Sequence, residues 1–405
     1  MYFSAAAQND AEGGTFMRNE EIKKELTEHI VPYWEALKDE EFGGFYGYKD
    51  FDLTVDKKAD KGVILHSRIL WFFSSCLEML GDEKYRILAD HAFDYVKNYC
   101  IDYELGGVYW MTSYDGKPVD DMKHTYNIAF AVYALSAYYN AAKVPEALDL
   151  AKKLFEDIET KTPDEYGCRE AFTRDWKIAD NEALSENGIN AEKTMNTVLH
   201  LIEAYTELYR AEKSEKVADA LRRQLSIVED KIFDSDNDVL RVFFDRKFEL
   251  LGDIHSYGHD IEASWLTDRA VEVLGDADLI KRFNAVDLRL AEKIYSIARE
   301  NGALNNERDG SHIDRKRVWW VQAEAVVGFL NAYQHSGDGK YLSAAGEIWD
   351  YIKEHIVDKR EGGEWFNEVG FDGTPDSSMP MTGPWKCPYH NGRMCLEVLR
   401  RGVHL

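Results

Sequence analysis

The chain has little of several features that would define its class quickly. Proline occurs only 8 times in 405 residues, so long helices can run without interruption. Cysteine occurs 5 times with no Cys-x-x-Cys pair, which argues against a disulfide framework and favours a reduced, cytoplasmic protein. Lysine and arginine number 49 against 74 acidic residues, a net charge of −25, and this excludes the positive surface that nucleic acid requires.

Other common signals are missing as well. We find no run of about 18 apolar residues, so we expect no membrane span. The sequence contains no Gly-x-Gly-x-x-Gly that opens a helix after a strand, no P-loop and no Gly-x-Ser-x-Gly, which disfavours dinucleotide, nucleotide-hydrolysing and serine-hydrolase functions. Residues 1–16 are small and polar, and we expect a disordered N-terminal extension before a single domain over 17–405.

What the chain does contain, almost throughout, is the apolar spacing of helices, which predicts an all-α fold. Short turns alternate with long loops between the helices, and glycine pairs and aromatic runs predict short strands in the long loops. The twelve predicted helices cover residues 19–37, 62–79, 84–99, 124–141, 145–160, 192–212, 214–231, 260–274, 278–300, 319–335, 340–356 and 388–401.

The alternation of loop length predicts how these helices are arranged. In an antiparallel series, every second connection emerges at the same end, so the long loops gather on one face and the turns on the other. Twelve helices in six hairpins close most simply as two concentric rings, an (α/α)6 barrel with the even-numbered helices inside. Long loops in a compact domain are usually functional, so we expect the pocket, with its short β-hairpins, at the mouth of the inner ring.

Each predicted inner helix begins with polar residues, at a repeat of roughly 60 to 70 positions. Four of the six beginnings carry a histidine, namely His66, His124, His259 and His390. Imidazole both takes and gives protons near neutral pH, and the helix N-terminus disfavours its cationic form. A single histidine of this kind is more often a core residue, but the repetition favours a site, and we expect His259 and His390 to carry the chemistry.

The segment from His255 to Glu262 also has the composition of a metal site. A zincin helix, however, needs glutamate directly after its first histidine, whereas Ser256 follows here and Gly258 stands where the helix begins. We therefore predict no metal. Glu262 lies one turn after His259, where it can support that ring or bind a substrate hydroxyl; the alternative is an acid favoured only by the helix dipole.

The remaining candidates are an arginine and a set of aromatic and polar side chains. A buried Arg68 is costly unless it is paired, so it either holds an oxyanion or pairs with Glu262 or Glu324. Trp385 precedes His390 in a loop and is suited to stacking on a sugar face. The other residues expected to line the pocket are Tyr126, Asn196, His200, Trp265, Trp320 and Glu324, with a core role still open for Trp265, Trp320 and His200.

Six motifs, in order along residues 18–405, then match a known family. They are the segments 61–71, 124–130, 182–187, 253–262, 317–324 and 383–393. Together they closely resemble the cellobiose 2-epimerases of the N-acylglucosamine 2-epimerase superfamily. The fold of that family is the (α/α)6 barrel, in agreement with the loop-length argument.

The resemblance implies cofactor-free, reversible inversion at C2 of the reducing-end glucose in β-1,4-linked disaccharides. Cellobiose would become glucosyl-mannose and lactose would become epilactose, through ring opening, a cis-enediolate and ring closure. We expect His390 to be the C2 base, and His259, supported by Glu262, to act at the ring oxygen and at O1, whose charge Arg68 stabilises. The resemblance further implies that Trp265, Trp320 and Glu324 are essential and that Tyr126, Asn196, His200 and Trp385 line the pocket.

Several alternatives stay open. An N-acetylglucosamine 2-epimerase or a mannose aldose–ketose isomerase would share the two-histidine chemistry. A glycoside hydrolase would need two carboxylates that flank a bond, and Glu186, Glu262 and Glu324 are candidates. A non-catalytic carbohydrate-binding barrel would not require both His259 and His390. We expect a monomer with a small-molecule substrate.

Overall fold

The helices of the computed structural model, which describes residues 12–181, 188–403 and 405, follow the twelve predicted segments closely. A π-helical segment, Glu25–Ile30, joins α1 and α2 into one helix, and similar segments (Val96–Cys100, Val228–Ile232 and Ile352–Ile356) extend α4, α8 and α12. The helices are α1 (Glu12–Lys24), α2 (Val31–Ala36), α3 (Val63–Leu80), α4 (Glu83–Tyr95), α5 (Thr125–Ala142), α6 (Pro145–Lys161), α7 (Met195–Ala211), α8 (Glu215–Ile227), α9 (Tyr257–Leu274), α10 (Ala277–Ile297), α11 (Trp319–Ser336), α12 (Gly339–Tyr351) and α13 (His390–Arg401).

Helix boundaries differ from the predictions at a few points that matter for the site. Helix α9 begins at Tyr257 rather than at 260, so His259 lies inside its first turn. Helix α7 begins at Met195 rather than at 192, because the two preceding residues form a strand. Helix α1 begins at Glu12, within the segment predicted as an extension.

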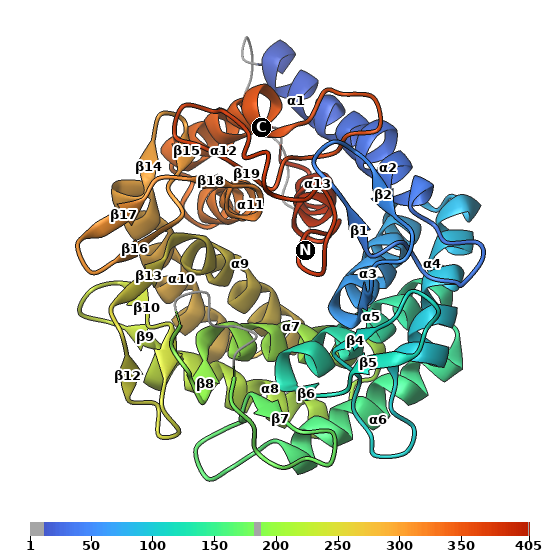
Figure 1. Ribbon diagram of the computed structural model, residues 1–405. Helices are drawn as coiled ribbons and strands as arrows, with labels where there is room; N and C mark the ends of the chain where they lie inside the picture. Colours follow the sequence, from blue (N-terminus) through green and yellow to red (C-terminus); the bar gives the residue numbers. More distant parts are fainter. Residues whose placement is uncertain (1–11, 182–187, 404) are drawn as a thin grey trace.

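The helices form two concentric rings, as predicted (Figure 1). Helices α3, α5, α7, α9, α11 and α13 form the inner ring; each packs on the next, and α13 packs on α3 and closes the circle. The outer helices α4, α6, α8, α10 and α12 each pack on the inner helix that precedes them in the chain, and α1 packs on α13. The fold is therefore an (α/α)6 barrel.

The inner helices are buried on nearly every side because both rings cover them. Helix α3 shows this most clearly: its 18 residues have a mean hydropathy of 1.3, long and apolar enough by length and composition to cross a membrane. The prediction that the chain has no apolar run of about 18 residues is therefore wrong for this helix. Since 78% of the segment is buried in the barrel, its composition is that of a core helix.

The turns at the closed face of the barrel have well-defined caps. Helices α3, α9 and α11 end at glycines with positive φ, such as Gly81 with a φ of 71°, a conformation that costs glycine least. The next residue is an aspartate that caps the following helix, as when Asp276 accepts from the backbone N–H groups of Asp278 and Leu279. These tight turns join three of the inner helices to the outer helices that follow them.

The long loops carry short antiparallel strands, as predicted. Five of them (β3, β6, β8, β13 and β18) directly precede inner helices and pair with a strand of the next long loop, which ties each helix beginning to its neighbour. The strands are β1 (Tyr48–Lys49), β2 (Val55–Asp56), β3 (Lys61–Gly62), β4 (Met111–Thr112), β5 (Pro118–Asp120), β6 (Lys123–His124), β7 (Ala171–Phe172), β8 (Lys193–Thr194), β9 (Phe233–Asp234), β10 (Val239–Leu240), β11 (Phe243–Phe244), β12 (Leu250–Leu251), β13 (Ile254–Ser256), β14 (Arg299–Glu300), β15 (Ala303–Leu304), β16 (Glu307–Asp309), β17 (His312–Asp314), β18 (Arg317–Val318) and β19 (Glu368–Val369).

A buried ion pair repeats beside these strands. The Nζ of Lys61 lies 2.7 Å from a carboxylate oxygen of Asp39, and Lys123 and Asp102 repeat the contact at 2.9 Å one unit later. A backbone bridge between Lys49 and Thr382 then joins the first long loop to the last. The mouth of the barrel is thus held all the way round.

Candidate active site

His390, the first residue of α13, lies at the mouth of the inner ring. Its Nδ1 is 2.7 Å from Oε1 of Glu324 on α11. A carboxylate only accepts hydrogen bonds, so the ring proton is on Nδ1 and Nε2 keeps its lone pair. Among the described residues, Nε2 has no hydrogen-bond partner, and 7% of the residue is exposed. His390 is therefore arranged as a base whose free nitrogen can reach a bound molecule.

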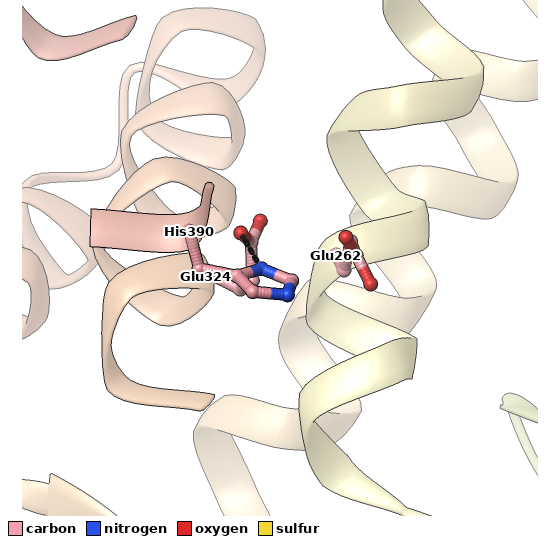
Figure 2. A group of neighbouring side chains, drawn as sticks. All are labelled: Glu262, Glu324 and His390. Atoms are coloured by element: carbon pink, nitrogen blue, oxygen red, sulfur yellow. Dashed lines mark hydrogen bonds and ion pairs between the residues drawn. The ribbon is translucent and has the colours of Figure 1, made fainter. Parts of the chain in front are cut away.

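Glu324 and Glu262 lie beside His390 and are held by one arginine. Figure 2 shows Glu262 approaching from α9, across from the His390–Glu324 pair. The Nη2 of Arg393 donates to Oε1 of Glu324 at 2.6 Å and also to Oε1 of Glu262. The indole Nε1 of Trp265 donates to the other oxygen of Glu324 at 2.9 Å. Glu324 therefore accepts from three side chains, one of which is the ring it orients, His390.

These three residues are also close enough to be considered as metal ligands. One ligand atom from each of Glu262, Glu324 and His390 lies within 4.8 Å of the others. The guanidinium of Arg393 already binds both carboxylates, and its positive charge opposes a divalent cation there. The two carboxylates are therefore better suited to bind the guanidinium of Arg393 than to bind a metal ion.

His259 faces the same pocket from the first turn of α9. Its Nδ1 lies 2.7 Å from the hydroxyl of Ser256, and its ring centroid is 4.8 Å from that of Trp320. Gly258 permits this approach, because a Cβ there would lie 2.5 Å from the Trp320 ring. Glu262 forms no hydrogen bond with His259; it is bound to Arg393 and acts on His259 through its charge. The expected support of His259 is therefore electrostatic.

Both histidines are neutral at ordinary pH, and the main reason is burial. Burial lowers the pKa of His259 to about 4, against the opposing charge of Glu262. Burial also lowers the pKa of His390 well below its usual range, and the charges of Arg393 and Arg68 add to the effect. The sequence argument assigned this neutrality to the helix N-terminus; desolvation is the larger cause.

Arg68 has no carboxylate partner among the described residues, so the alternative that it pairs with Glu262 or Glu324 is wrong. Its Nη2 donates to the hydroxyl of Tyr126 at 2.8 Å, and its guanidinium lies 4.2 Å from the ring centroid of Phe130. The residue is 3% exposed, and its Nε has no partner. A buried, largely unneutralised guanidinium is suited to a developing oxyanion.

His200 and Tyr389 belong to the same charged network. Nδ1 of His200 lies 3.0 Å from Oε2 of Glu203, which also accepts from the Tyr389 hydroxyl. Nη1 of Arg393 donates to the other oxygen of Glu203 at 2.6 Å. Burial alone would raise the pKa of Glu203, but Arg393, His200 and Tyr389 lower it to about 2, so this carboxylate stays ionised.

The aromatic candidates occupy different positions. Trp320 is half-buried between the two histidines, 5.4 Å from the His390 ring. Trp265 is 1% exposed and acts through Glu324. Trp385 is 43% exposed and lies 6.0 Å from the Tyr126 ring, at the mouth. Asn196 is half-buried with an unpartnered Oδ1. Trp385 is thus placed to contact a ligand.

The two other histidines of the predicted pattern are structural, and so is His255. His66 accepts from the backbone N–H of Phe45, and His124 bonds the amide of Asn181. Nε2 of His255 lies 2.6 Å from Asp260, so His255 and His259 do not converge on a metal. Of the four histidines at the predicted helix beginnings, His259 and His390 therefore contact Trp320 in the pocket, and His66 and His124 do not.

The sequence argument also missed residues. Arg393, Glu203 and Tyr389 are buried in the network but were not among the expected site residues. Arg393 follows His390 by three positions, which places both on one helix face, and this spacing was the available signal. Glu186 and the motif at 182–187 lie outside the described residues.

One prediction concerns the buried neutral histidines. Burial lowers the pKa of His66 to about 3, whereas the unfolded chain has the ordinary value of about 6.5. As pH falls below the unfolded value, only the unfolded chain takes this proton, so the contribution of His66 to stability falls. We expect the destabilisation caused by His66→Gln to be about 1–2 kcal/mol smaller at pH 5 than at pH 7. Urea unfolding at both values measures this difference; an equal or larger cost at pH 5 would contradict it.

Comparison with known proteins agrees with this geometry. The N-acylglucosamine 2-epimerase (GlcNAc 2-epimerase) family model matches residues 43–391. A cellobiose 2-epimerase from Ruminococcus albus is 63% identical over 385 residues, which is 95% of this chain and 99% of that protein. The crystal structure of a sugar epimerase from a ruminal bacterium superposes with a TM-score of 0.95 at 62% identity, covering 96% of this chain and 100% of the other.

A second solved structure gives the same result at lower identity. The cellobiose 2-epimerase from Bacillus thermoamylovorans superposes with a TM-score of 0.93 at 45% identity and covers 95% of this chain and 100% of the other. The resemblance seen in the motifs is confirmed over nearly the whole chain. The protein is a member of the N-acylglucosamine 2-epimerase family.

Proposed function

We propose that this protein inverts C2 of the reducing-end glucose of cellobiose and related β-1,4-linked disaccharides, lactose among them. The observation that carries the proposal is the pair of neutral imidazoles, His390 and His259, on either side of Trp320. A neutral imidazole with a free nitrogen can accept a proton from carbon and return it. Relatives named cellobiose 2-epimerase at 63% and 48% identity support the choice of substrate.

The first step opens the sugar ring. His259 accepts the proton of the C1 hydroxyl at Nε2 and delivers it to the ring oxygen, and the bond between C1 and that oxygen breaks to give the aldehyde. Ser256 holds the other ring nitrogen of His259 at 2.7 Å, so the exchanging nitrogen faces the pocket. The proton count is conserved within the sugar.

The second step removes and restores the C2 proton. His390 takes this proton at Nε2, and the C–H electrons form the C1–C2 double bond of an enediolate with negative charge on O1. Arg68 and the Tyr126 hydroxyl bound to it stabilise that charge. After rotation about C2–C3, the imidazolium returns the proton to the other face of C2, and His259 reverses the ring opening. No step needs an external oxidant or reductant.

Trp385 favours a disaccharide over a monosaccharide. Its exposed indole lies at the mouth, 6.0 Å from the rings of Trp110 and Tyr126. A flat apolar surface outside the histidine pair is suited to the non-reducing sugar.

The five cysteines all lie in the described residues and are free, which supports our proposal of a reducing, cytoplasmic location.

Hydrolysis is less well supported by the side chains. Glu262 and Glu324 are the two available carboxylates in the described pocket, and both are bound to Arg393 at 1% exposure or less. A hydrolase needs one of the pair protonated as an acid and the other facing the sugar or a water. The other family chemistry, aldose–ketose isomerisation, uses the same enediolate and differs only in where the proton returns.

A single experiment tests the proposal. EDTA-treated protein is incubated with cellobiose in D2O, and the reaction is monitored by proton NMR. We expect a mannose-type reducing end with deuterium at C2. Free glucose would instead identify a hydrolase, and a fructose-type end would identify an isomerase. Absence of any change with cellobiose would contradict the substrate, and N-acetylglucosamine and mannose would then be tried.

A further inference from the structure

Arg393 is the most highly bonded side chain of the pocket, yet it has no role in the steps above. It lies on α13, one turn after His390, and is 1% exposed. Its two terminal nitrogens contact three carboxylates from three different helices: Glu203 on α7, Glu262 on α9 and Glu324 on α11. One guanidinium thus ties four of the six inner helices together beneath the reacting groups.

The contact with Glu324 is the one that reaches the chemistry. Nη2 of Arg393 and Nδ1 of His390 approach the same oxygen of Glu324, at 2.6 Å and 2.7 Å. The same Nη2 lies 3.4 Å from Nδ1 of His390. If the arginine moved, the carboxylate would be free to turn, and the His390 ring would lose the partner that fixes its tautomer.

The charges around His390 come from several helices and nearly balance. The anions are Glu262, Glu324 and the more distant Glu203, and the cations are Arg393 and Arg68. His200 and Tyr389, which both bond Glu203, also face the network. Lys386, in the loop before α13, lies over Trp319, which packs on His390. Removal of the Arg393 charge would leave the carboxylates in excess and favour the imidazolium form of His390.

We propose that Arg393 is a positioning residue: its guanidinium locks Glu324 so that His390 presents a bare Nε2, and its charge keeps that base unprotonated. Arg393 does not touch the substrate in this arrangement; it acts through Glu324 and through its charge. The kinetic part of the inference rests on the proposed epimerisation. The tautomer part is a property of the free protein and stands without it.

Two variants separate geometry from charge. Arg393→Lys keeps the charge but lacks the planar guanidinium that binds three carboxylates. We therefore expect kcat to fall about 10²-fold, with little change in the acid limb of the pH profile of kcat/KM, where activity falls as His390 is protonated. Arg393→Gln removes the charge as well, so we expect the acid limb to move up by about one pH unit or more. Arg401→Lys is the control, because Arg401 is half-buried on the same helix and bonds Asn331 and Gln334.

The decisive readout is the protonation pattern of the ring. In protein labelled with ¹⁵N-histidine and free of substrate, we expect His390 to show the Nδ1–H tautomer in the wild type and in Arg401→Lys. In Arg393→Gln we expect that single tautomer to be lost. The inference is overturned by a folded Arg393→Gln protein that keeps the tautomer and the acid limb and loses no more activity than Arg401→Lys.

A second variant covers the case in which Arg393→Gln does not fold. Glu203→Gln is nearly isosteric and leaves the Arg393 charge less compensated, so we expect the acid limb to move to lower pH, opposite to Arg393→Gln. An unchanged limb, or one that moves upward, would overturn the charge argument. If the wild type fails to turn over cellobiose, the proposed function fails, but the ¹⁵N spectra are recorded without substrate and still decide the tautomer.

Discussion

His390→Ala is expected to abolish both turnover of cellobiose and deuterium incorporation at C2, while the protein still binds the sugar. A general base contributes roughly 10²–10⁴-fold, and no other described group has a free imidazole nitrogen beside Glu324. His259 also contacts the Trp320 ring, at 4.8 Å against 5.4 Å for His390, but Glu324 bonds only His390 of the two, so His259 lacks the partner that orients the base. Proton NMR in D2O gives the rate, and titration calorimetry gives the binding.

His355→Ala is the matched control for this experiment. His355 belongs to the π-helical segment after α12, on the outer ring, and its side chain is 31% exposed. Its replacement should leave the rate of C2 exchange unchanged. If His390→Ala still exchanged the C2 proton at a rate close to that of the wild type, the assignment of the base would be wrong.

Glu324→Ala is expected to damage both stability and activity. The change leaves two buried donors without an acceptor, Nδ1 of His390 and Nε1 of Trp265, and removes one of the two carboxylates that Nη2 of Arg393 binds. Removal of one partner of a buried ion pair typically costs about 3–5 kcal/mol. We therefore expect a large fall in the urea midpoint, together with a loss of kcat comparable to that of His390→Ala.

Two further variants separate these effects. Glu324→Gln keeps the volume and one acceptor oxygen, so it should recover part of the stability but little of the activity, because an amide orients the imidazole less firmly. Glu354→Ala, at a side chain that is 75% exposed, should change stability by less than about 0.5 kcal/mol. Full activity in Glu324→Gln would show that Glu324 does not orient His390 through its charge.

The architecture could be predicted from the sequence because it depends on local signals. Apolar spacing gave the helices, and glycine–aspartate pairs such as Gly275 and Asp276 marked the turns. The alternation of long and short connections then indicated that the six helical hairpins close into two concentric rings. The errors were at helix beginnings, because the strands that precede the inner helices are held by pairing with distant loops, as Lys193 and Thr194 are with Phe244 and Phe243.

The site could be predicted only in part, for a related reason. His390, His259 and Arg68 stand out because they interrupt apolar helices, and the structure brings them to one pocket. Whether a histidine is free or satisfied depends on partners that are remote in sequence, such as Asn181 for His124. The role of Arg393 depends on three carboxylates, the nearest of them 69 positions away; spacing along a single helix cannot reveal it.

The closed circle of helices has a consequence for how the molecule tolerates loss of its ends. An open array of helical repeats can shed a terminal unit and keep the rest folded, because each unit contacts only its neighbours. Here α13 packs between α11 and α3, and Lys49 bridges to Thr382, so the two ends of the chain are neighbours. Removing α13 would open a gap beside α3 and take His390 and Arg393 with it. A truncation that opens the inner ring therefore also removes the catalytic base, His390. We expect a chain shortened in this way to lose its structure and its activity together.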